Sequence, residues 1–373
     1  MRYRMEYTLI KRKLGTGRVV YYYAVYDDLT GKRVYRSTGE KTKAMAEKYV
    51  RELADEGKLG IKDRSKVLLK DYAKDFFIPG KCPIEKNAHA RGRSMTKATL
   101  AIRRTSLNEH ILPHLGNMPI SCITAAHINK WLLELPAKDK ISRATANRQM
   151  SALSSILDYA VKDGMLRTNP CKNIELLGND TKSRKAFTLE EVKTIIGKEE
   201  NWPNPMIRTI CMVAAMTGMR LGEIRALKPD CVSPEAITIK ASYSNIDGHK
   251  TPKNGRERIA PITEELYKSI MKYNWGDGGY IFRLYKPDKP MSSAWIEKEL
   301  NRRMERVGIK GKTFHSFRYF FNTQCMSNNI NETALRAVMG HANEEMTKRY
   351  LDVESAEFPY FRKVQDSIAE NFA

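Results

Sequence analysis

The sequence lacks any long apolar run, which argues against a membrane-spanning protein. Its most apolar stretch, Ile207 to Met216, is about ten residues long and contains Arg208, whereas a helix needs roughly 20 apolar residues to cross a bilayer. The N-terminal residues MRYRMEYTLIKRK also lack the apolar core of a signal peptide. We therefore expect no membrane partner and a cytoplasmic location.

Cysteine motifs are lacking as well. The six cysteines are scattered without a CxxC pair, and no HExxH motif is present. Neither a disulfide framework nor a zinc site is expected, and a set of reduced thiols fits the cytoplasm. The sequence predicts no metal site, and it contains no internal repeat or low-complexity segment.

Acidic residues are too few to balance the basic ones. The 65 Lys and Arg residues exceed the 43 Asp and Glu residues, which gives a formal charge of +22 at pH 7. An excess of this size favours a polyanionic partner, nucleic acid before an anionic membrane. The alternative is a highly soluble basic protein that binds no polyanion.

At 373 residues the chain predicts two or three domains. In residues 1–60, three β-rich runs separated by turns precede a helical pattern over Lys41 to Leu53, with Ala44, Ala46, Tyr49, Val50 and Leu53 as its apolar positions. Of Tyr21, Tyr22 and Tyr23, at least one is expected in the core, because side chains alternate along a strand. A basic three-stranded sheet can enter the DNA major groove, and a solvated sheet face is the alternative. The candidate DNA contacts are Lys11, Arg12, Lys13, Arg18, Arg33 and Arg36.

Residues 65–172 predict a helical bundle, after a polar joint at Gly57 to Arg64. Helices are expected over residues 68–77, 94–112, 125–135 and 142–163, with a basic loop over residues 79–93. Basic side chains near the edges of such a bundle suit contact with the backbone of duplex DNA; an ordinary helical domain with a charged surface remains equally open. The candidate contacts are Lys97, Arg103, Arg104, Arg143 and Arg148.

After a second polar linker, residues 183–373 predict an α-rich domain with a small antiparallel sheet. Thr188 and Glu191 form a capping-box pattern. Strands are expected over residues 236–242 and 256–262, with a loop over residues 244–255 between them. The fold class is therefore multidomain and mainly α: a small α+β unit with a three-stranded sheet and a helix, a helical bundle, and an α-rich domain with a small antiparallel sheet.

The stretch from Thr313 to Val353 concentrates reactive side chains. His315 and Arg318 are three residues apart, so both lie on one helix face. Tyr350 is a latent nucleophile, which at neutral pH needs a base or a cationic field because a phenol has a pKa near 10. His315 can accept its proton, and Arg318 can bind the oxygens of a phosphate through two parallel hydrogen bonds. His341 can donate a hydrogen bond to the same phosphate.

Two upstream segments supply a second arginine and a general acid, which this stretch lacks. Arg220 follows a glycine break, and Glu223, one helical turn on, can hold its guanidinium in place. Lys253 lies at a predicted hairpin tip and can protonate a leaving oxygen. Lys250 is a rival to Lys253. Tyr319 and Tyr360 are rival nucleophiles.

Taken together, these residues resemble the tyrosine recombinase (phage integrase) family. Its pattern is an arginine in TGxRxxE, a hairpin lysine before RxxP, then HxxR, GH and a tyrosine nine residues after that histidine. The sequence matches at Arg220, Glu223, Lys253, His315, Arg318, His341 and Tyr350. It departs from the usual residues around HxxR at Ser316, Phe317 and Tyr319, none of them a catalytic position. The three-part layout resembles integrases of temperate phages and conjugative transposons.

The resemblance implies an arm-type DNA-binding domain (1–60), a core-binding domain (65–172) and a catalytic domain (183–373). It implies that Tyr350 forms a 3′-phosphotyrosine with double-stranded DNA, that no cofactor takes part, and that four protomers act together. An excisionase and a host DNA-bending protein are implied accessory partners. The tail, with Phe358, Phe361, Val364 and Ile368, is expected to dock on a neighbouring protomer, to pack in cis or to be disordered.

Two other functions remain open at this stage. A type IB topoisomerase uses the same residues to relax DNA, although relaxation needs no second DNA-binding site such as the basic sheet. A catalytically idle DNA-binding regulator is the other alternative, although such a protein is expected to lose at least one charged site residue.

Overall fold

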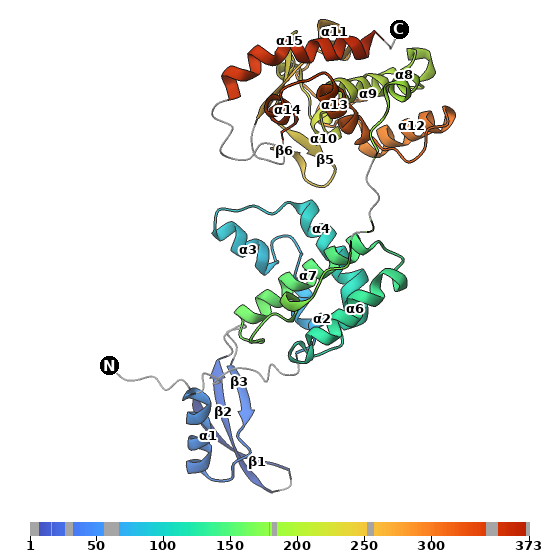
Figure 1. The fold of residues 1–373 in the computed structure, drawn as a ribbon. Helices are drawn as coiled ribbons and strands as arrows, with labels where there is room; N and C mark the ends of the chain where they lie inside the picture. The colour runs from blue at the N-terminus through green and yellow to red at the C-terminus, as the bar shows by residue number, and fades with distance from the viewer. Residues whose placement is uncertain are drawn as a thin grey trace. The chain divides into compact units, whose positions relative to one another are not determined.

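The computed structural model describes residues 7–15, 17–26, 33–55, 67–178, 180, 185–251, 257–340 and 350–370, with backbone alone for 350–356. Three separate hydrophobic clusters lie in residues 7–53, 67–177 and 187–369. We refer to the sheet part (7–55), the central helical part (67–180) and the C-terminal part (185–370), each coloured by residue number in Figure 1. The polar joint expected at Gly57 to Arg64 lies outside the described residues.

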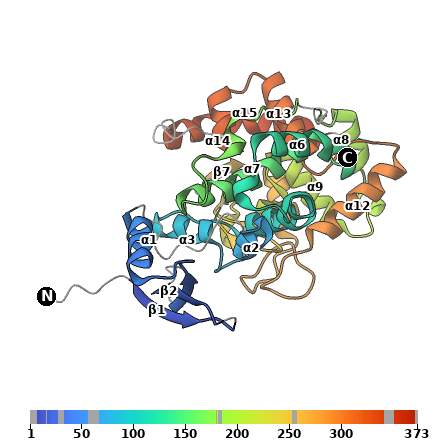
Figure 2. The same cartoon turned by 90° about the horizontal axis from the view of Figure 1, so that it is seen from below.

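The sheet part has the predicted three strands and helix. Strands β1 (Thr8–Lys13), β2 (Val19–Tyr26) and β3 (Arg33–Ser37) form an antiparallel sheet in that order. Helix α1 (Lys43–Asp55) packs along it, as Figure 2 shows from a second direction. Tyr23, Val25 and Val50 form the buried core, so the prediction of a core tyrosine among the three is confirmed.

Two of the predicted apolar positions of α1 were wrong. Ala46 and Val50 are buried and Leu53 packs beside them, but Ala44 and Tyr49 are exposed. Residues 46, 50 and 53 follow the spacing of one helical face, whereas positions 44 and 49 lie off it. The helix therefore packs a single narrow apolar stripe against the sheet.

The central part is helical, as predicted, but its first third differs. Its helices are α2 (Leu69–Tyr72), α3 (Pro83–Ala90), α4 (Lys97–Thr105), α5 (Leu112–Leu115), α6 (Ala125–Lys138) and α7 (Arg143–Lys162). The helix expected over residues 68–77 ends at Tyr72 and continues only as a 3-10 turn to Asp75, and the loop expected over residues 79–93 contains α3. Left-handed backbone at Phe77 and Gly80 stops the first helix, and Pro83 at its first position starts the next.

The other predicted helices of this part are present. A π-helical stretch, Ser106–Ile111, joins α4 to α5 within the helix predicted over residues 94–112. The side chain of Ser142 accepts a hydrogen bond from the backbone of Thr145 and caps α7. Buried aliphatic side chains from α6 and α7 then form much of the core, among them Ile128, Leu132, Leu153, Ile156 and Leu157.

The C-terminal part has a helical core with two small sheets. Its helices are α8 (Leu189–Ile196), α9 (Pro205–Thr217), α10 (Leu221–Arg225), α11 (Glu264–Met271), α12 (Ser293–Arg306), α13 (Ser316–Ser327), α14 (Glu332–Met339) and α15 (Tyr350–Ala369). Its strands are β4 (Ala236–Ile239), β5 (Ser242–Ser244), β6 (Gly248–Lys250) and β7 (Arg258–Pro261). The capping box of Thr188 and Glu191 is confirmed at the start of α8.

The loop expected over residues 244–255 was partly wrong, because it contains a hairpin. Strands β5 and β6 pair antiparallel, as do β4 and β7. Asp247 accepts hydrogen bonds from Ser244 and Lys250, and Gly248 has a φ of +69°. These contacts close a tight turn that alternation of apolar residues does not reveal.

The described side chains of the C-terminal helix α15 pack against their own chain. Phe361, Val364 and Ile368 are buried in the cluster of their own chain. The amide nitrogen of Gln365 donates to the carbonyls of Met216 (2.7 Å) and Pro261 (2.8 Å). Of the three states left open for the tail, the structure has the one in which it packs on its own chain. No helix among the described residues is long and apolar enough to cross a bilayer.

Gly218 ends α9 with a φ of +63°, and a Cβ there would lie 2.6 Å from Met339 Sδ and 2.7 Å from a ring carbon of Phe321. We predict that Gly218→Ala destabilises the C-terminal part by roughly 1–2 kcal/mol of backbone strain and about 1–3 kcal/mol of overpacking. Gly308→Ala is the matched control, since Gly308 has a φ of +74° and nothing within 4 Å of its Cβ position. Calorimetric unfolding of both variants measures the difference, and equal losses would contradict the packing argument.

Candidate active site

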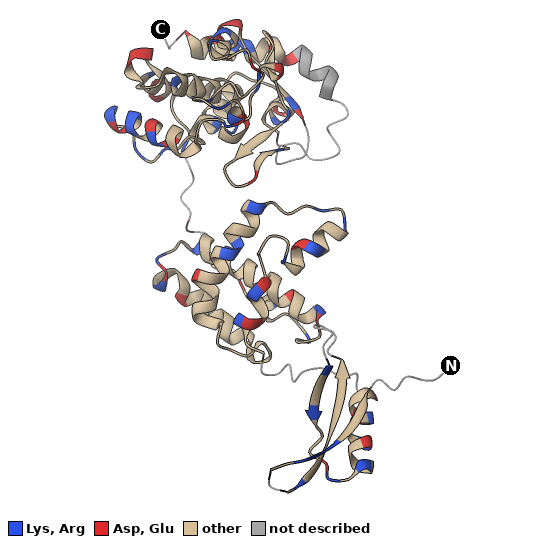
Figure 3. Cartoon of the chain, turned by 180° about the vertical axis from the view of Figure 1, so that it is seen from behind, with Lys and Arg blue, Asp and Glu red and all other residues tan. Residues whose placement is uncertain are grey.

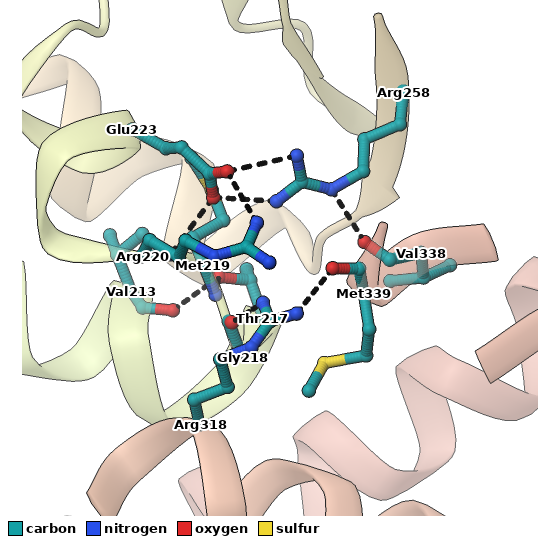
Figure 4. A network of polar contacts seen from close by, with 10 residues as sticks. All are labelled: Val213, Thr217, Gly218, Met219, Arg220, Glu223, Arg258, Arg318, Val338 and Met339. Carbon is teal, nitrogen blue, oxygen red and sulfur yellow. Dashed lines mark hydrogen bonds and ion pairs between the residues drawn. The ribbon is translucent and has the colours of Figure 1, made fainter. Parts of the chain in front are cut away.

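The end of α9 and the start of α10 position the first arginine of the site. Gly218 is left-handed and stops α9, so the chain turns and Arg220 lies in extended backbone just before α10. Glu223 in the first turn of α10 accepts hydrogen bonds from the backbone nitrogen of Arg220 (2.9 Å) and from its Nη1 (3.0 Å). Figure 4 shows both contacts. Glu223 thus holds this guanidinium, as the sequence predicts.

Helix α13 carries the second arginine into the same place. Arg318 is buried, and its Nη1 donates to the carbonyl of Gly218 (2.7 Å) while its Nη2 donates to the carbonyl of Met339. Burial, and then the positive charge of Arg220, lower the pKa of Arg318 to about 10. Arg318 therefore remains a cation at neutral pH, and its charge lies close to that of Arg220.

His315 lies one turn before Arg318, immediately before α13. Its half-buried ring meets the ring of Tyr319 edge to face, with centroids 5.1 Å apart. Because His315 and Arg318 are three residues apart at the start of one helix, they lie on the same side of it. Tyr319, one of the rival nucleophiles, instead packs against the predicted base.

A third arginine belongs to this cluster, and the sequence did not single it out. Arg258 at the start of β7 donates through Nη1 to Oε1 (3.0 Å) and through Nη2 to Oε2 (2.5 Å) of Glu223. Its Nε donates to the carbonyl of Val338 (2.9 Å). Two signals pointed to Arg258. It begins the R-x-x-P segment, and it lies on the same strand face as Ala260, which is buried.

One carboxylate holds two of the three cations in this network. Glu223 is 1% exposed. Burial opposes its ionisation, but the hydrogen bonds and charges of Arg258 and Arg220 outweigh that effect, and its pKa lies below its ordinary value. Three guanidiniums and one carboxylate leave two positive charges among these residues. Such a surplus beside a half-exposed Arg220 is suited to bind an anion.

The other predicted catalytic residues are Lys253, His341 and Tyr350. Lys253 and His341 lie outside the described residues. Tyr350 is the first residue of α15, and its side chain lies outside the description too. Lys250, the rival to Lys253, has its ammonium 2.7 Å from Asp247 in its own hairpin. Tyr360, the other rival nucleophile, lies on the exposed side of α15 next to Lys363.

The predicted DNA contacts of the sheet part divide between two faces. Arg12 stacks over the rings of Tyr22 (4.9 Å) and Tyr35 (5.2 Å), and Arg33 over Tyr35 (5.8 Å). These side chains share the face turned away from α1, because Tyr23 and Val25 face the helix and neighbours alternate. By the same alternation Lys11, Lys13 and Arg36 belong to the other face, and Arg18 precedes β2. We call Arg12, Tyr22, Arg33 and Tyr35 the open face.

In the central part, the predicted contacts also separate. Lys97, Arg143 and Arg148 are exposed. Arg104, in contrast, donates from Nη1 to the carbonyls of Lys74 and Phe76, both at 3.0 Å. Its guanidinium therefore secures the turn after α2, a structural role that the sequence interpretation missed. Arg103 lies over the ring of Phe77.

Charged groups elsewhere do not form a metal site in the described part of the chain. No group of three or more His, Cys, Asp or Glu residues there could hold a metal ion. Lys and Arg are distributed over the sheet part, the central part and the C-terminal part, as Figure 3 shows. The described site contains a cluster of three arginines, Arg220, Arg258 and Arg318.

Two family models match the chain. Residues 185–357 match the phage integrase family, and residues 84–176 match the phage integrase central domain. The tyrosine recombinase XerC of Chlamydia caviae is 22% identical over 246 residues, 63% of this chain and 76% of its own.

Solved structures show the same fold. The Tn1549 transposon integrase in complex with a circular intermediate DNA has a TM-score of 0.57 at 19% identity, over 77% of this chain and 97% of its own. The lambda integrase tetramer bound to a Holliday junction has a TM-score of 0.58 at 18% identity, over 92% of this chain and 98% of its own. The chain belongs to the tyrosine recombinase (phage integrase) family.

Proposed function

We propose that this chain is a site-specific DNA recombinase that cuts and rejoins strands through a 3′-phosphotyrosine, and so integrates and excises a mobile element. The observation that carries the proposal is the cluster in which Glu223 holds Arg220 and Arg258 while Arg318 lies beside them. Helix α15, whose first residue is Tyr350, packs against α13 and β7, which bear two of these arginines.

The proposed first step is attack of the Tyr350 oxygen on the scissile phosphorus. The bond from phosphorus to the 5′ oxygen breaks, Lys253 gives that oxygen a proton, and His315 accepts the proton of the phenol. Arg220 and Arg318 hold the non-bridging oxygens, on which negative charge builds, and His341 donates a hydrogen bond to them.

The second step reverses the first with a different strand. A 5′ hydroxyl of the partner DNA attacks the phosphotyrosine, the bond to Tyr350 breaks, and the strand is resealed. The energy of the phosphodiester is kept in the covalent link, so the reaction needs no ATP. The charge on the phosphate is met by Arg220, Arg318 and Lys253, so the proposal needs no metal ion or cofactor.

The three hydrophobic clusters support a division of labour among three domains. Residues 1–60 bind arm-type DNA through the sheet, residues 65–172 bind the core site, and residues 183–373 carry out catalysis. The open face combines arginines with tyrosines on one side of a sheet, which suits insertion into a groove. A separate DNA-binding sheet favours recombination over simple relaxation of DNA, which needs one site alone.

Recombination requires several protomers on double-stranded DNA. The similarity to the lambda integrase tetramer bound to a Holliday junction supports assembly of four copies, which exchange one pair of strands and then the other. Recombination takes place in the cytoplasm, and an excisionase and a host DNA-bending protein set the direction of recombination.

The first prediction of the proposed function concerns the nucleophile. Tyr350→Phe removes the attacking oxygen and should abolish the covalent adduct with a nicked duplex that carries the recombination site, while binding of the duplex is retained. Denaturing gels measure the adduct and anisotropy the binding. Tyr360→Phe is the matched control on the same helix and should form the adduct normally. An adduct from Tyr350→Phe would show that another residue attacks.

The second prediction concerns the sheet. Replacement of Arg12 and Arg33 by alanine should weaken binding to arm-site DNA by roughly 1–3 kcal/mol for each lost contact, with cleavage of core sites unchanged. The control replaces Lys43 and Lys48 on α1, which are exposed but lie off the open face. Equal weakening by both double variants, measured by anisotropy, would refute the assignment of the open face.

The third prediction separates the two kinds of arginine in the central part. Arg148→Ala should reduce the slope of log binding constant against log salt by about 0.9, the value of one phosphate contact. Arg104→Ala should leave that slope unchanged and lower the melting temperature, because its guanidinium is bound to carbonyls. A salt titration and a thermal melt of both variants measure the slope and the melting temperature. A reduced slope for Arg104→Ala would contradict its structural role.

A further inference from the structure

The Arg258 side chain is nearly buried and is held by its neighbours. It is 8% exposed and that of Arg220 is 30% exposed, although both guanidiniums contact the same carboxylate. Each nitrogen of the Arg258 guanidinium donates a hydrogen bond: Nη1 and Nη2 donate to Glu223, and Nε donates to the carbonyl of Val338. We therefore expect Arg258 to affect the chemistry through the groups it touches.

The group of most consequence is Glu223. Its two oxygens accept four hydrogen bonds, two from Arg258, one from the backbone of Arg220 and one from Nη1 of Arg220. A carboxylate has about four lone-pair sites, so this one is saturated. As long as Arg258 occupies both oxygens, the guanidinium of Arg220 can donate only one hydrogen bond to Glu223.

Without Arg258, the balance around Arg220 changes. A buried carboxylate that loses its bidentate partner carries a strong penalty, and the nearest remaining cation is Arg220. Two parallel hydrogen bonds between Arg220 and Glu223 would relieve that penalty. They would also turn the guanidinium away from solvent, and so away from a phosphate that it has to bind.

Arg258 also connects the segments that bear other site residues. It begins β7, five residues after Lys253 in the chain. A Cβ on Gly340 would lie 3.1 Å from Arg258 Cδ and 3.2 Å from Nε, so the chain just before His341 passes directly over the arginine. The Arg258 side chain therefore joins the start of β7 to the α10 carboxylate and to the end of α14.

We infer that Arg258 is a positioning residue for the phosphate-binding Arg220: by occupying both oxygens of Glu223, it keeps one edge of the Arg220 guanidinium available for the scissile phosphate. This inference rests on the proposed recombinase function. It predicts that loss of Arg258 impairs the neutralisation of phosphate charge and not the attack of the tyrosine as such.

The test compares two nicked duplexes that carry the recombination site. One has an ordinary scissile phosphate, and the other has a methylphosphonate there, in which a methyl group replaces one charged oxygen. Arg258→Gln should slow cleavage of the phosphate by about 100-fold, the size of effect expected of a misplaced catalytic group, and cleavage of the methylphosphonate by only about threefold relative to wild type. Arg258→Lys should give an intermediate ratio, because it keeps the charge and loses the two-oxygen contact.

Arg303→Gln is the matched structural control. Arg303 donates to the carbonyls of Ile195 and Thr194 in the same part of the chain, but it belongs to α12 and caps α8. A loss of folded protein lowers both cleavage rates equally, so the ratio of the two rates should equal that of wild type for this variant. An unchanged ratio for Arg258→Gln would overturn the inference.

A double-mutant cycle adds a second criterion. If Arg258 acts through Glu223, then Glu223→Gln combined with Arg258→Gln should cleave the phosphate no more slowly than the slower single variant. Multiplicative losses would show that Arg258 acts by another route. Absence of any covalent adduct with the wild-type chain would instead refute the proposed function, so the two failures are distinguishable.

Discussion

The buried carboxylate of Glu223 is the constraint on which the rest of the site depends. A charge that is 1% exposed is tolerated only when it is paired and fully hydrogen-bonded, and Arg220 and Arg258 meet that demand from two directions. Its folded pKa is lowered, so the stability it adds is present above the unfolded pKa and is lost as pH falls through the folded pKa. A structural requirement thereby fixes Arg220, the arginine that we propose binds the phosphate.

The second arginine is fixed by the ends of two helices. Arg318 donates to the carbonyls of Gly218 and Met339, at the C-terminal ends of α9 and α14. Those ends carry unsatisfied carbonyls and partial negative charge, and both close with a left-handed glycine, Gly218 or Gly340. A buried cation there satisfies the carbonyls and joins two segments that are more than a hundred residues apart. Burial of Arg318 follows from this arrangement.

Much of this fold could be predicted from sequence, because local signals were strong. The capping box at Thr188, Pro205 at the start of α9 and the glycines that end helices marked boundaries well. The hairpin of β5 and β6 was missed because turn contacts such as that of Ser244 with Asp247 leave no apolar periodicity. Helix α3 was missed because its eight residues, PIEKNAHA, contain few apolar side chains. The contacts of Arg258 and Arg104 could not be predicted for another reason: whether an arginine meets solvent or a buried partner depends on tertiary contacts that spacing along the chain does not encode.

The central proposal is that Tyr350 becomes joined to DNA. The most direct measurement is peptide mapping by mass spectrometry of the adduct trapped on a nicked duplex, together with sequencing of the attached DNA end. The account predicts one modified peptide that contains Tyr350, linked to a 3′ phosphate, with a free 5′ hydroxyl on the other side of the break. A link through any other residue, or to a 5′ phosphate, would contradict it.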